Sequence, residues 1–460
     1  MKLLSLLTIA AASLGLARQM GAAPRDTPPP APRADLHPGL RALYETPLQD
    51  FGLDAALFDE LWRVWTGPAR RRAARASAAE RRAMTLERYG LFTDPDRGSD
   101  VPVAFAERGD GRWALNCLGC HSGQLDGVLV HGLGGSTFDF QLLVRDLIAL
   151  RARRGLPLSM QEQGMAIFPL GGASGVTNAQ GFSVVLAAFR HGDLSFSEEP
   201  TPLGEELARA AVADLDAPPL WHLSTRSRLY LDGYVAKDPR VPMQFSLGLE
   251  MEPARVEALE PAYQDIWRWM ESLEPPTWPH EVDMELAATG AAIFRRACAR
   301  CHGTAGDYPE RRVPLDVVGT DALRARSMPR AFREFMSQSW LTRFGEVDVE
   351  LDPEGYVAPP LDGIWASAPY FHNGSVPTLW HVLHPDDRPE AWRRVGGGYD
   401  AERVGLAIEE RDERPRGLDP AERRTWVDTA REGRSAGGHR FPGRLAEEER
   451  RALLEYLKTL

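Results

Sequence analysis

All four cysteines of this 460-residue chain lie in two copies of one pattern, Cys-x-x-Cys-His. The two copies consist of Cys117, Cys120 and His121, and of Cys298, Cys301 and His302. No cysteine is left for a structural disulfide once both pairs are used. The pattern therefore excludes a disulfide-stapled scaffold, and it places the same chemistry at two points of the chain.

The Cys-x-x-Cys-His pattern is typical of covalent haem c attachment. Two thiols three positions apart on one turn can form thioethers with the two haem vinyl groups, and the next histidine can then reach the iron. One alternative is a zinc site with four thiolates, which does not need the histidines. Another is a thioredoxin-like redox pair, which needs a βαβ setting that is not indicated here. We therefore expect two haem c groups, with His121 and His302 as proximal ligands.

The ligand on the opposite face of each iron decides between electron transfer and chemistry. No methionine follows Met336, and we expect Met328 and Met336 to pack in helices near the second motif. Histidine therefore remains as the sixth ligand of the second haem. The candidates are His372, His381, His384 and His439. A bis-histidine iron is closed and has a lower potential than a histidine–methionine iron.

Composition indicates an ordinary globular protein, with 43% hydrophobic and 26% charged residues. The length suits two or three domains. A net charge of -11 argues against a nucleic acid or an anionic membrane as partner, because either would need a basic surface. It is compatible with a basic protein partner.

The N-terminus predicts export. Lys2 precedes a mainly apolar stretch over residues 3–17, and small residues follow at 21–23. This is typical of a cleavable secretory signal over residues 1–23, and the stretch is too short for a stable membrane span. An uncleaved N-terminal anchor is the alternative. We expect a periplasmic or secreted bacterial protein with no membrane span in the mature chain.

The rest of the chain predicts a mainly α fold: two cytochrome c-like haem domains with long loops and little β structure. Residues 24–39 form a proline-rich linker. Residues 40–280 form an N-terminal haem domain with a helical extension, and residues 281–460 form the C-terminal haem domain. The proline-rich breaker at 275–279 marks the boundary. Helical spacing of apolar residues is found at 40–95, 138–151, 286–296 and 445–460, and the arginine-rich stretch 70–82 predicts a solvated helix face.

Residues 359–365 and 368–379, the latter reading Ala-Pro-Tyr-Phe-His-Asn-Gly-Ser-Val-Pro-Thr-Leu, resemble the bacterial di-haem cytochrome c peroxidase superfamily. The second stretch is most similar to the rubber-oxygenase-like branch. Residues 290–294, 318–321 and 438–441 also fit, and the resemblance covers about residues 110–460. In this superfamily the N-terminal haem is usually the reactive one, and the C-terminal haem stores electrons.

The resemblance implies ligands for the second haem. In the rubber-oxygenase branch this haem has two histidine ligands, which gives His302 and His372 here. The peroxidases use a methionine at a position that is Asp386 in this chain, so peroxidase-type ligation is absent. The resemblance to peroxidases also allows a calcium ion between the domains.

For the first haem, the resemblance implies two different distal sides. A peroxidase-like site would use Glu250 as acid and base, with Gln244 beside it. An oxygenase-like pocket would be apolar, with Trp221, His222, Tyr230, Tyr234 and Phe245 as candidates, and His222 could also be a resting ligand. The alternatives are a helix-surface glutamate and ordinary core packing.

Three functions follow. The first is a peroxidase that takes electrons from a small redox protein at the second haem and reduces hydrogen peroxide at the first. The second is a dioxygenase that cleaves an alkene with dioxygen. The third is a non-catalytic electron carrier.

Overall fold

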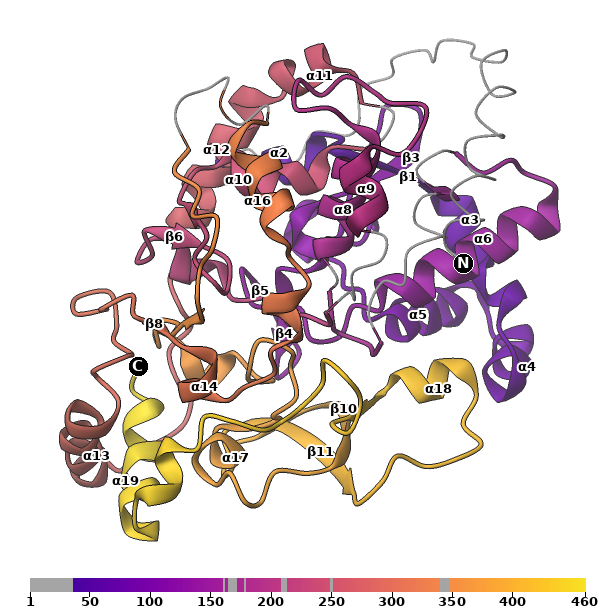
Figure 1. Cartoon of the computed structure of the whole chain (residues 1–460). Coiled ribbons are helices and arrows are strands. Elements are labelled where there is room, and N and C mark those ends of the chain that lie inside the picture. The colour runs from indigo at the N-terminus through magenta and orange to yellow at the C-terminus, as the bar shows by residue number, and fades with distance from the viewer. Residues whose placement is uncertain are drawn as a thin grey trace.

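The computed structural model describes residues 36–159, 162–163, 172–177, 179–207, 213–248, 251–339, 342 and 347–460. The predicted signal segment 1–23 and residues 24–35 of the predicted linker lie outside this range. Helices of the N-terminal half occupy the upper part of Figure 1 together with residues 330–337, and the elements after residue 379 lie below them. The helices are α2 (Pro38–Glu45), α3 (Ala55–Glu60), α4 (Gly67–Arg75), α5 (Ala78–Tyr89), α6 (Phe140–Arg154), α8 (Ala179–Phe189), α9 (Pro202–Leu207), α10 (Arg240–Met243), α11 (Pro253–Ala258), α12 (Glu260–Glu271), α13 (Met284–Ala297), α14 (Leu315–Val318), α15 (Leu323–Arg326), α16 (Arg330–Ser337), α17 (Leu379–Leu383), α18 (Pro420–Arg424) and α19 (Glu447–Leu457).

The strands form several small antiparallel sheets. The two three-stranded sheets have the orders β1-β3-β2 and β11-β10-β12, and the pairs β4-β5, β6-β7 and β8-β9 stand apart. The strands are β1 (Gln49–Asp54), β2 (Phe105–Glu107), β3 (Arg112–Leu115), β4 (Ser122–Leu125), β5 (Val128–His131), β6 (Arg228–Leu229), β7 (Val235–Ala236), β8 (Arg312–Val313), β9 (Tyr356–Val357), β10 (Ala391–Asp400), β11 (Gly405–Arg411) and β12 (Trp426–Asp428).

The prediction of a mainly α fold with little β structure is wrong. Helices make up 41% and strands 14% of the structure, so the fold is mixed. Most strands have only two to four residues, too few for an alternating pattern to stand out. The longest strand, β10, carries three consecutive glycines and is exposed over much of its length, so its sequence resembles a loop.

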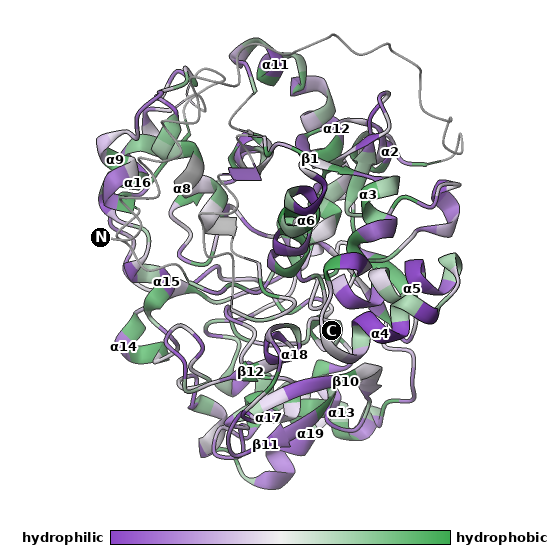
Figure 2. Ribbon diagram, turned by 90° about the vertical axis from the view of Figure 1, so that its right-hand side faces the viewer, coloured by the Kyte–Doolittle hydropathy of each residue, from purple (hydrophilic) through white to green (hydrophobic). Residues whose placement is uncertain are grey.

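The arginine-rich stretch forms two helices rather than one. The first ends at Arg75, with the extended Ala76 as its cap. Ser77 starts the second, because its hydroxyl accepts from the Glu80 backbone N–H while the Glu80 carboxylate accepts from the Ser77 N–H. In Figure 2, α4 is coloured mainly as hydrophilic, and α5 alternates between hydrophilic and hydrophobic residues. The predicted solvated face is therefore confirmed, with Arg71, Arg72 and Arg75 exposed.

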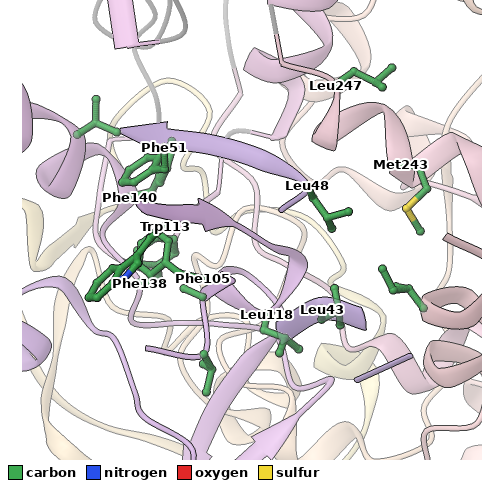
Figure 3. Close-up of a cluster of buried hydrophobic side chains, with 14 of the residues drawn as sticks. Leu43, Leu48, Phe51, Phe105, Trp113, Leu118, Phe138, Phe140, Met243 and Leu247 are labelled. Atoms are coloured by element: carbon green, nitrogen blue, oxygen red, sulfur yellow. The ribbon is translucent and has the colours of Figure 1, made fainter. Parts of the chain in front are cut away.

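The larger hydrophobic cluster surrounds Trp113 of β3. Its ring lies 5.3 Å from that of Phe58 and 5.6 Å from that of Phe105. Figure 3 shows Leu118, the residue after Cys117, in the same cluster as Phe105 and Trp113. Leu118 lies between Cys117 and Cys120 in the sequence, so its burial in this cluster anchors the first cysteine pair to the core.

A second cluster is built around Trp365 and Leu453 in the C-terminal half. Each cluster also takes residues from the other half of the chain. The first includes Phe332 and Met336, and the second includes Trp221. The packing therefore does not separate into the two helical haem domains that were expected, and the boundary near residue 280 stays a prediction.

Helices α13 and α19 pack side by side in Figure 1. Gly290 makes this possible, because a side chain at that position would collide with the backbone carbonyl of Ala452. This contact fixes the end of α13, and the second cysteine pair begins directly after it at Cys298.

Candidate functional site

The first Cys-x-x-Cys-His turn follows strand β3 and is held by Asn116. The Asn116 side-chain oxygen accepts from the backbone N–H of Leu118 at 2.9 Å. Its amide group donates to the carbonyls of Leu43 and Val103, both at 2.9 Å. One buried amide therefore joins the turn to helix α2 and to the segment before β2.

The second turn has the same backbone conformation although a helix precedes it. The N–H of His302 donates to the carbonyl of Cys298 at 3.0 Å, as the N–H of His121 does to that of Cys117 at 3.0 Å. In each turn the second cysteine N–H also donates to the first cysteine carbonyl. The two copies therefore present two thiols and one imidazole in the same order on one turn.

All four thiols are free, so neither pair forms a disulfide. Burial raises the pKa of Cys117 to about 12 and that of Cys298 to about 11, with a smaller contribution from the second cysteine of each pair. No group of three or more potential metal-binding side chains is found within the described ranges, so the pairs do not meet in a four-thiolate site. This geometry does not fit the zinc alternative.

Both motif histidines use the same ring nitrogen in the same way. His121 Nδ1 lies 3.0 Å from the carbonyl of Pro218, and His302 Nδ1 lies 2.9 Å from that of Pro359. A carbonyl only accepts, so Nδ1 carries the proton and Nε2 keeps its lone pair. Such a bond fixes the tautomer and orientation of a metal-ligating histidine. The residues present therefore fit haem c, with the thiols for its vinyl groups and Nε2 for its iron.

The two accepting carbonyls belong to segments that meet each other. Residues 218–222 hold the first carbonyl, and residues 359–362 hold the second. Trp221 donates its indole N–H to the carbonyl of Asp362 at 2.8 Å, and His222 donates from Nε2 to the same carbonyl at 2.8 Å. A short path of backbone and hydrogen bonds thus connects His121 to His302 through Trp221.

His439 is the histidine that lies against the second motif. Its ring centre is 6.0 Å from that of His302, at an angle of 72° between the planes. Two imidazoles on opposite sides of one metal have centres about 6.3 Å apart, given metal–nitrogen bonds of about 2.0 Å. The ring makes no hydrogen bond to another residue in the described part of the chain, and Phe371 and Phe441 flank it. The two rings are therefore at a separation at which one metal ion could lie between them.

The other three histidine candidates have different surroundings. The ring of His372 lies 4.9 Å from that of Tyr356. Burial lowers the pKa of His372 to about 4. His381 contacts the Thr378 hydroxyl at 2.7 Å, and His384 binds the Trp380 carbonyl and the Glu447 carboxylate. The structure does not bring any of these three rings against His302.

The predicted distal residues fall into two groups. Tyr230 stacks on Tyr234 at 5.3 Å, and its hydroxyl accepts from the Gln244 amide at 2.9 Å. Gln244 also donates to the Val241 carbonyl and accepts from the Ser183 hydroxyl. Trp221 and His222 instead point to Asp362. Glu250 and the side chain of Phe245 lie outside the described residues.

The sequence interpretation missed two groups of buried polar residues. Tyr263 lies close enough to Cys117 for the thiol to affect its pKa, and its hydroxyl is 2.8 Å from that of Ser246. Burial raises the pKa of Tyr263 to about 12. The second group is an ion-pair cluster around Asp232, with Arg324 and Arg333. No sequence motif signals either group, since their members come together only in the fold.

Comparison with known proteins supports a haem site. Residues 355–393 match the family described as RoxA-like, cytochrome c-like. The match includes His372 and both Pro359 and Asp362, but neither cysteine pair. It supports covalently bound haem c and the resemblance to the rubber-oxygenase-like branch. The resemblance to peroxidases and the presence of two haems stay predictions.

Two curated proteins of Sinorhizobium fredii (strain NBRC 101917 / NGR234) are also similar. The chain is 30% identical to uncharacterized protein y4iM over 286 residues, which cover 53% of this chain and 64% of y4iM. It is 29% identical to uncharacterized protein y4iJ over 257 residues, 41% of each. The chain thus matches less than two thirds of either relative. No described helix is long and apolar enough to span a bilayer. Taken with the family match, the site indicates a haem-dependent, oxidoreductase-like role.

Proposed function

We propose that this chain is an exported di-haem c-type cytochrome with a peroxidase-like activity. Each Cys-x-x-Cys-His turn holds one haem, a small redox protein delivers electrons at the second, and hydrogen peroxide is reduced to water at the first. The haems, when bound, supply electron storage and activation of the oxidant. The residues of the chain then set which iron is closed and how the two sites communicate.

The observation that carries this proposal is the path through Trp221. His121 and His302 each donate to a proline carbonyl, and the two proline segments meet at the hydrogen bond from Trp221 to the Asp362 carbonyl. Gly363 allows the close approach, because it has a φ of +64° and a side chain there would meet the Trp221 ring. Such a connection suits a protein in which two sites exchange electrons.

The two sites are also unequal, as an enzyme of this kind requires. His439 lies opposite His302, so we propose His439 in place of His372 as the sixth ligand of the second iron. Within the described ranges no imidazole is in ring contact with His121, and His222 is engaged with Asp362. One closed and one open iron would separate electron storage from the reaction.

Gln244 is proposed to position Tyr230 rather than to move a proton. Its amide already makes three hydrogen bonds, to Tyr230, Val241 and Ser183. A carboxamide does not titrate, so a proton carrier is needed besides it. Glu250, which lies outside the described residues, remains the proposed acid and base at the first haem, because a carboxylate can carry a proton between the peroxide oxygens.

A second function, an alkene-cleaving dioxygenase, is favoured by one observation. Residues 355–393 match the RoxA-like, cytochrome c-like family. In that case the stacked pair Tyr230 and Tyr234 would border a largely apolar pocket, and the chain would cleave its substrate with dioxygen instead of reducing peroxide.

Rapid mixing of the reduced holoprotein with hydrogen peroxide separates these functions. A peroxidase should reoxidise both haems within a few turnovers, as followed by visible absorption. Trp221→Phe should slow reoxidation of the second haem about 10-fold or more while the first still reacts, if the path carries electrons. Trp62→Phe is the matched control, because it removes an indole group that lies outside this path.

The outcomes are distinct. No acceleration by peroxide, together with cleaved products from polyisoprene under dioxygen, would establish the dioxygenase. If the protein reacts with neither peroxide nor dioxygen, the remaining function is that of a non-catalytic electron carrier. Mass spectrometry of the mature protein should show two haems per chain, and a single haem would contradict the di-haem proposal.

A further inference from the structure

A buried cluster of charges lies between the two halves of the chain. Asp232, which is only 1% exposed, accepts from Arg333 at 3.0 Å. The same carboxylate oxygen lies 3.6 Å from Nη1 of Arg324, beyond hydrogen-bond distance. One carboxylate thus faces two guanidinium groups, and its hydrogen bond is used by Arg333.

Arg324 shares the Asp232 carboxylate with Arg333 and makes no hydrogen bond to it. Its residue is 4% exposed, and its Nη1 is buried with no hydrogen bond to any described residue. An arginine cannot lose its proton in a protein, so the charge must be compensated. Burying a guanidinium whose N–H groups lack acceptors is unfavourable. This arrangement indicates that Arg324 is completed by an anion.

The neighbouring carboxylate of Asp321 adds a negative charge to this region, but it makes no hydrogen bond to Arg324. Its two oxygens accept from the backbone N–H groups of Leu323 and Ser435, at 2.8 and 3.2 Å. The Arg324 charge instead acts on Tyr230, Tyr356 and His372, all of which are neutral when buried as they are here.

The segment that carries Arg324 runs beside the proposed ligand loop of the second haem. The N–H of His439 donates to the carbonyl of Val318 at 2.6 Å, and Ser435 bonds to Asp321. His372, which feels the Arg324 charge, follows Phe371, whose ring packs on that of His439 at 6.0 Å. The segment that leads into α15 therefore lies beside the loop that carries His439.

We propose that Arg324 binds a propionate carboxylate of the haem attached to Cys298 and Cys301. Haem carries two such carboxylates, and a guanidinium matches a carboxylate with two parallel N–H donors. Arg333 and Asp232 then act as the support that holds Arg324 in place. This inference rests on the proposed function only in that it requires a haem at the second motif.

The test compares the full-length holoproteins of Arg324→Gln, Arg324→Lys and Arg326→Gln. Arg326 lies two residues further along α15 and is exposed, so it controls for a charge change in the same helix. The reduction potential of each haem is measured by redox titration with electron paramagnetic resonance, from about pH 5 to about pH 9.

Loss of the cation favours the ferric state, so Arg324→Gln should lower the potential of the second haem. It should also raise the pKa at which the potential changes with pH, because the propionate is protonated more easily without the nearby Arg324 cation. Arg324→Lys should stay near the parent protein, and Arg326→Gln should match it. The first haem should be unaffected in all three.

Unchanged potentials and an unchanged pH profile in Arg324→Gln would overturn the proposal, as would a shift confined to the first haem. A potential that follows added chloride or phosphate in the parent protein but not in Arg324→Gln would also overturn it, since an exchangeable anion would then fill the site. If the Arg324→Gln protein does not incorporate its haems, redox-difference infrared spectra of protein with ¹³C-labelled propionates test the contact instead. The labelled band should differ between parent and Arg324→Lys, and identical bands would reject the contact.

Mass spectrometry keeps this test separate from the proposed function. A parent protein without haem at the second motif would defeat the di-haem proposal itself. If every variant carries both haems and the potentials do not change, only the proposed role of Arg324 is wrong.

Discussion

His439 and His372 differ at the scale of single residues in what their rings contact. The His439 ring lies 6.0 Å from that of His302 and makes no hydrogen bond to another described residue, whereas the His372 ring packs on Tyr356. A ligand needs a free nitrogen, and only His439 combines that with proximity to His302.

We therefore expect His439→Ala to convert the second haem from low-spin to high-spin, while His372→Ala leaves it low-spin. Electron paramagnetic resonance of the oxidised proteins measures this directly. The His372→Ala protein is the matched control, since it removes an imidazole of similar burial. Loss of the low-spin signal in His372→Ala alone would reverse the assignment.

Arg388 fixes the loop that carries His439. Its guanidinium donates to the carbonyls of Ala436 and Gly438, both at 2.7 Å, and more weakly to that of His439 at 3.4 Å. It also stacks over Phe371 at 4.8 Å. Burial lowers the pKa of Arg388 to about 10, so it stays charged at neutral pH.

Replacing Arg388 by Gln should lower the free energy of unfolding by about 2–4 kcal/mol, because several carbonyls lose a charged donor. It should also broaden the low-spin signal of the second haem, since His439 becomes less fixed. Arg388→Lys should recover part of both. Urea unfolding and the same resonance spectra measure the two effects, and a stability loss with an unaltered signal would mean that Arg388 does not position His439.

At the scale of elements, the sequence predicted helices better than strands. The stretches 286–296 and 138–151 became α13 and α6, because their apolar residues repeat at helical spacing and a capping aspartate precedes each. Leu53 and Leu57 shared that spacing, yet Leu53 lies in β1, where pairing with β3 outweighs the local pattern. The pairing of His302 with His439 depends on tertiary contacts, so sequence reasoning could only include His439 among four candidates.

Gly290 is the point where α13 and α19 come closest. We expect Gly290→Ala to destabilise the protein by about 1–3 kcal/mol, because the added methyl group must displace the Ala452 backbone although alanine favours a helix. Gly306→Ala is the control, since a side chain there meets no atom within 4 Å. Thermal unfolding measures both, and equal effects of the two changes would contradict the packing argument.

Asp94 links helix α2 to strand β5 in a pH-dependent way. His131 and then Tyr44 bond its carboxylate and hold the pKa of Asp94 well below its usual range. A depressed folded pKa stabilises the fold above the unfolded pKa of about 4, and this contribution is lost as pH falls below that value.

The variant Asp94→Asn should therefore be less stable than the parent at pH 7, and the difference should shrink toward about pH 3. Urea unfolding at both pH values measures it. Asp126→Asn, at an exposed position, should show no such convergence. If the difference in stability between the parent and Asp94→Asn is the same at both pH values, the charge of Asp94 does not contribute to stability.

At the scale of the whole molecule, arginines of the C-terminal half hold the N-terminal half. Arg394 donates to Ser136, Arg424 to Asp139, and Arg434 to Asp214. The breaker at 275–279 is a real gap between α12 and α13, but these contacts cross it. The helix break is therefore readable from the sequence, and the domain boundary that it suggested stays a prediction. The packing across the break is not readable, because it depends on single side chains far apart in the chain.

The Arg424 contact is the strongest of these by geometry. Its Nε reaches both Asp139 oxygens at 2.9 and 2.8 Å, and its Nη2 reaches one of them at 2.6 Å. Asp139 is 2% exposed and also caps α6 by accepting from the Leu142 N–H. Removing Arg424 would leave a buried carboxylate without its cation.

We therefore expect Arg424→Ala to lower the free energy of unfolding by about 3–5 kcal/mol. Arg423→Ala, at the exposed neighbouring position, should change it by less than about 0.5 kcal/mol. Asp139→Asn combined with Arg424→Ala should recover part of the loss, since the uncompensated charge is then absent while the amide oxygen can still cap α6. Urea unfolding of the holoprotein measures all three. Equal effects of Arg424→Ala and Arg423→Ala would mean that this ion pair does not hold the halves together, and the crossing contacts of Arg394 and Arg434 would then carry the connection.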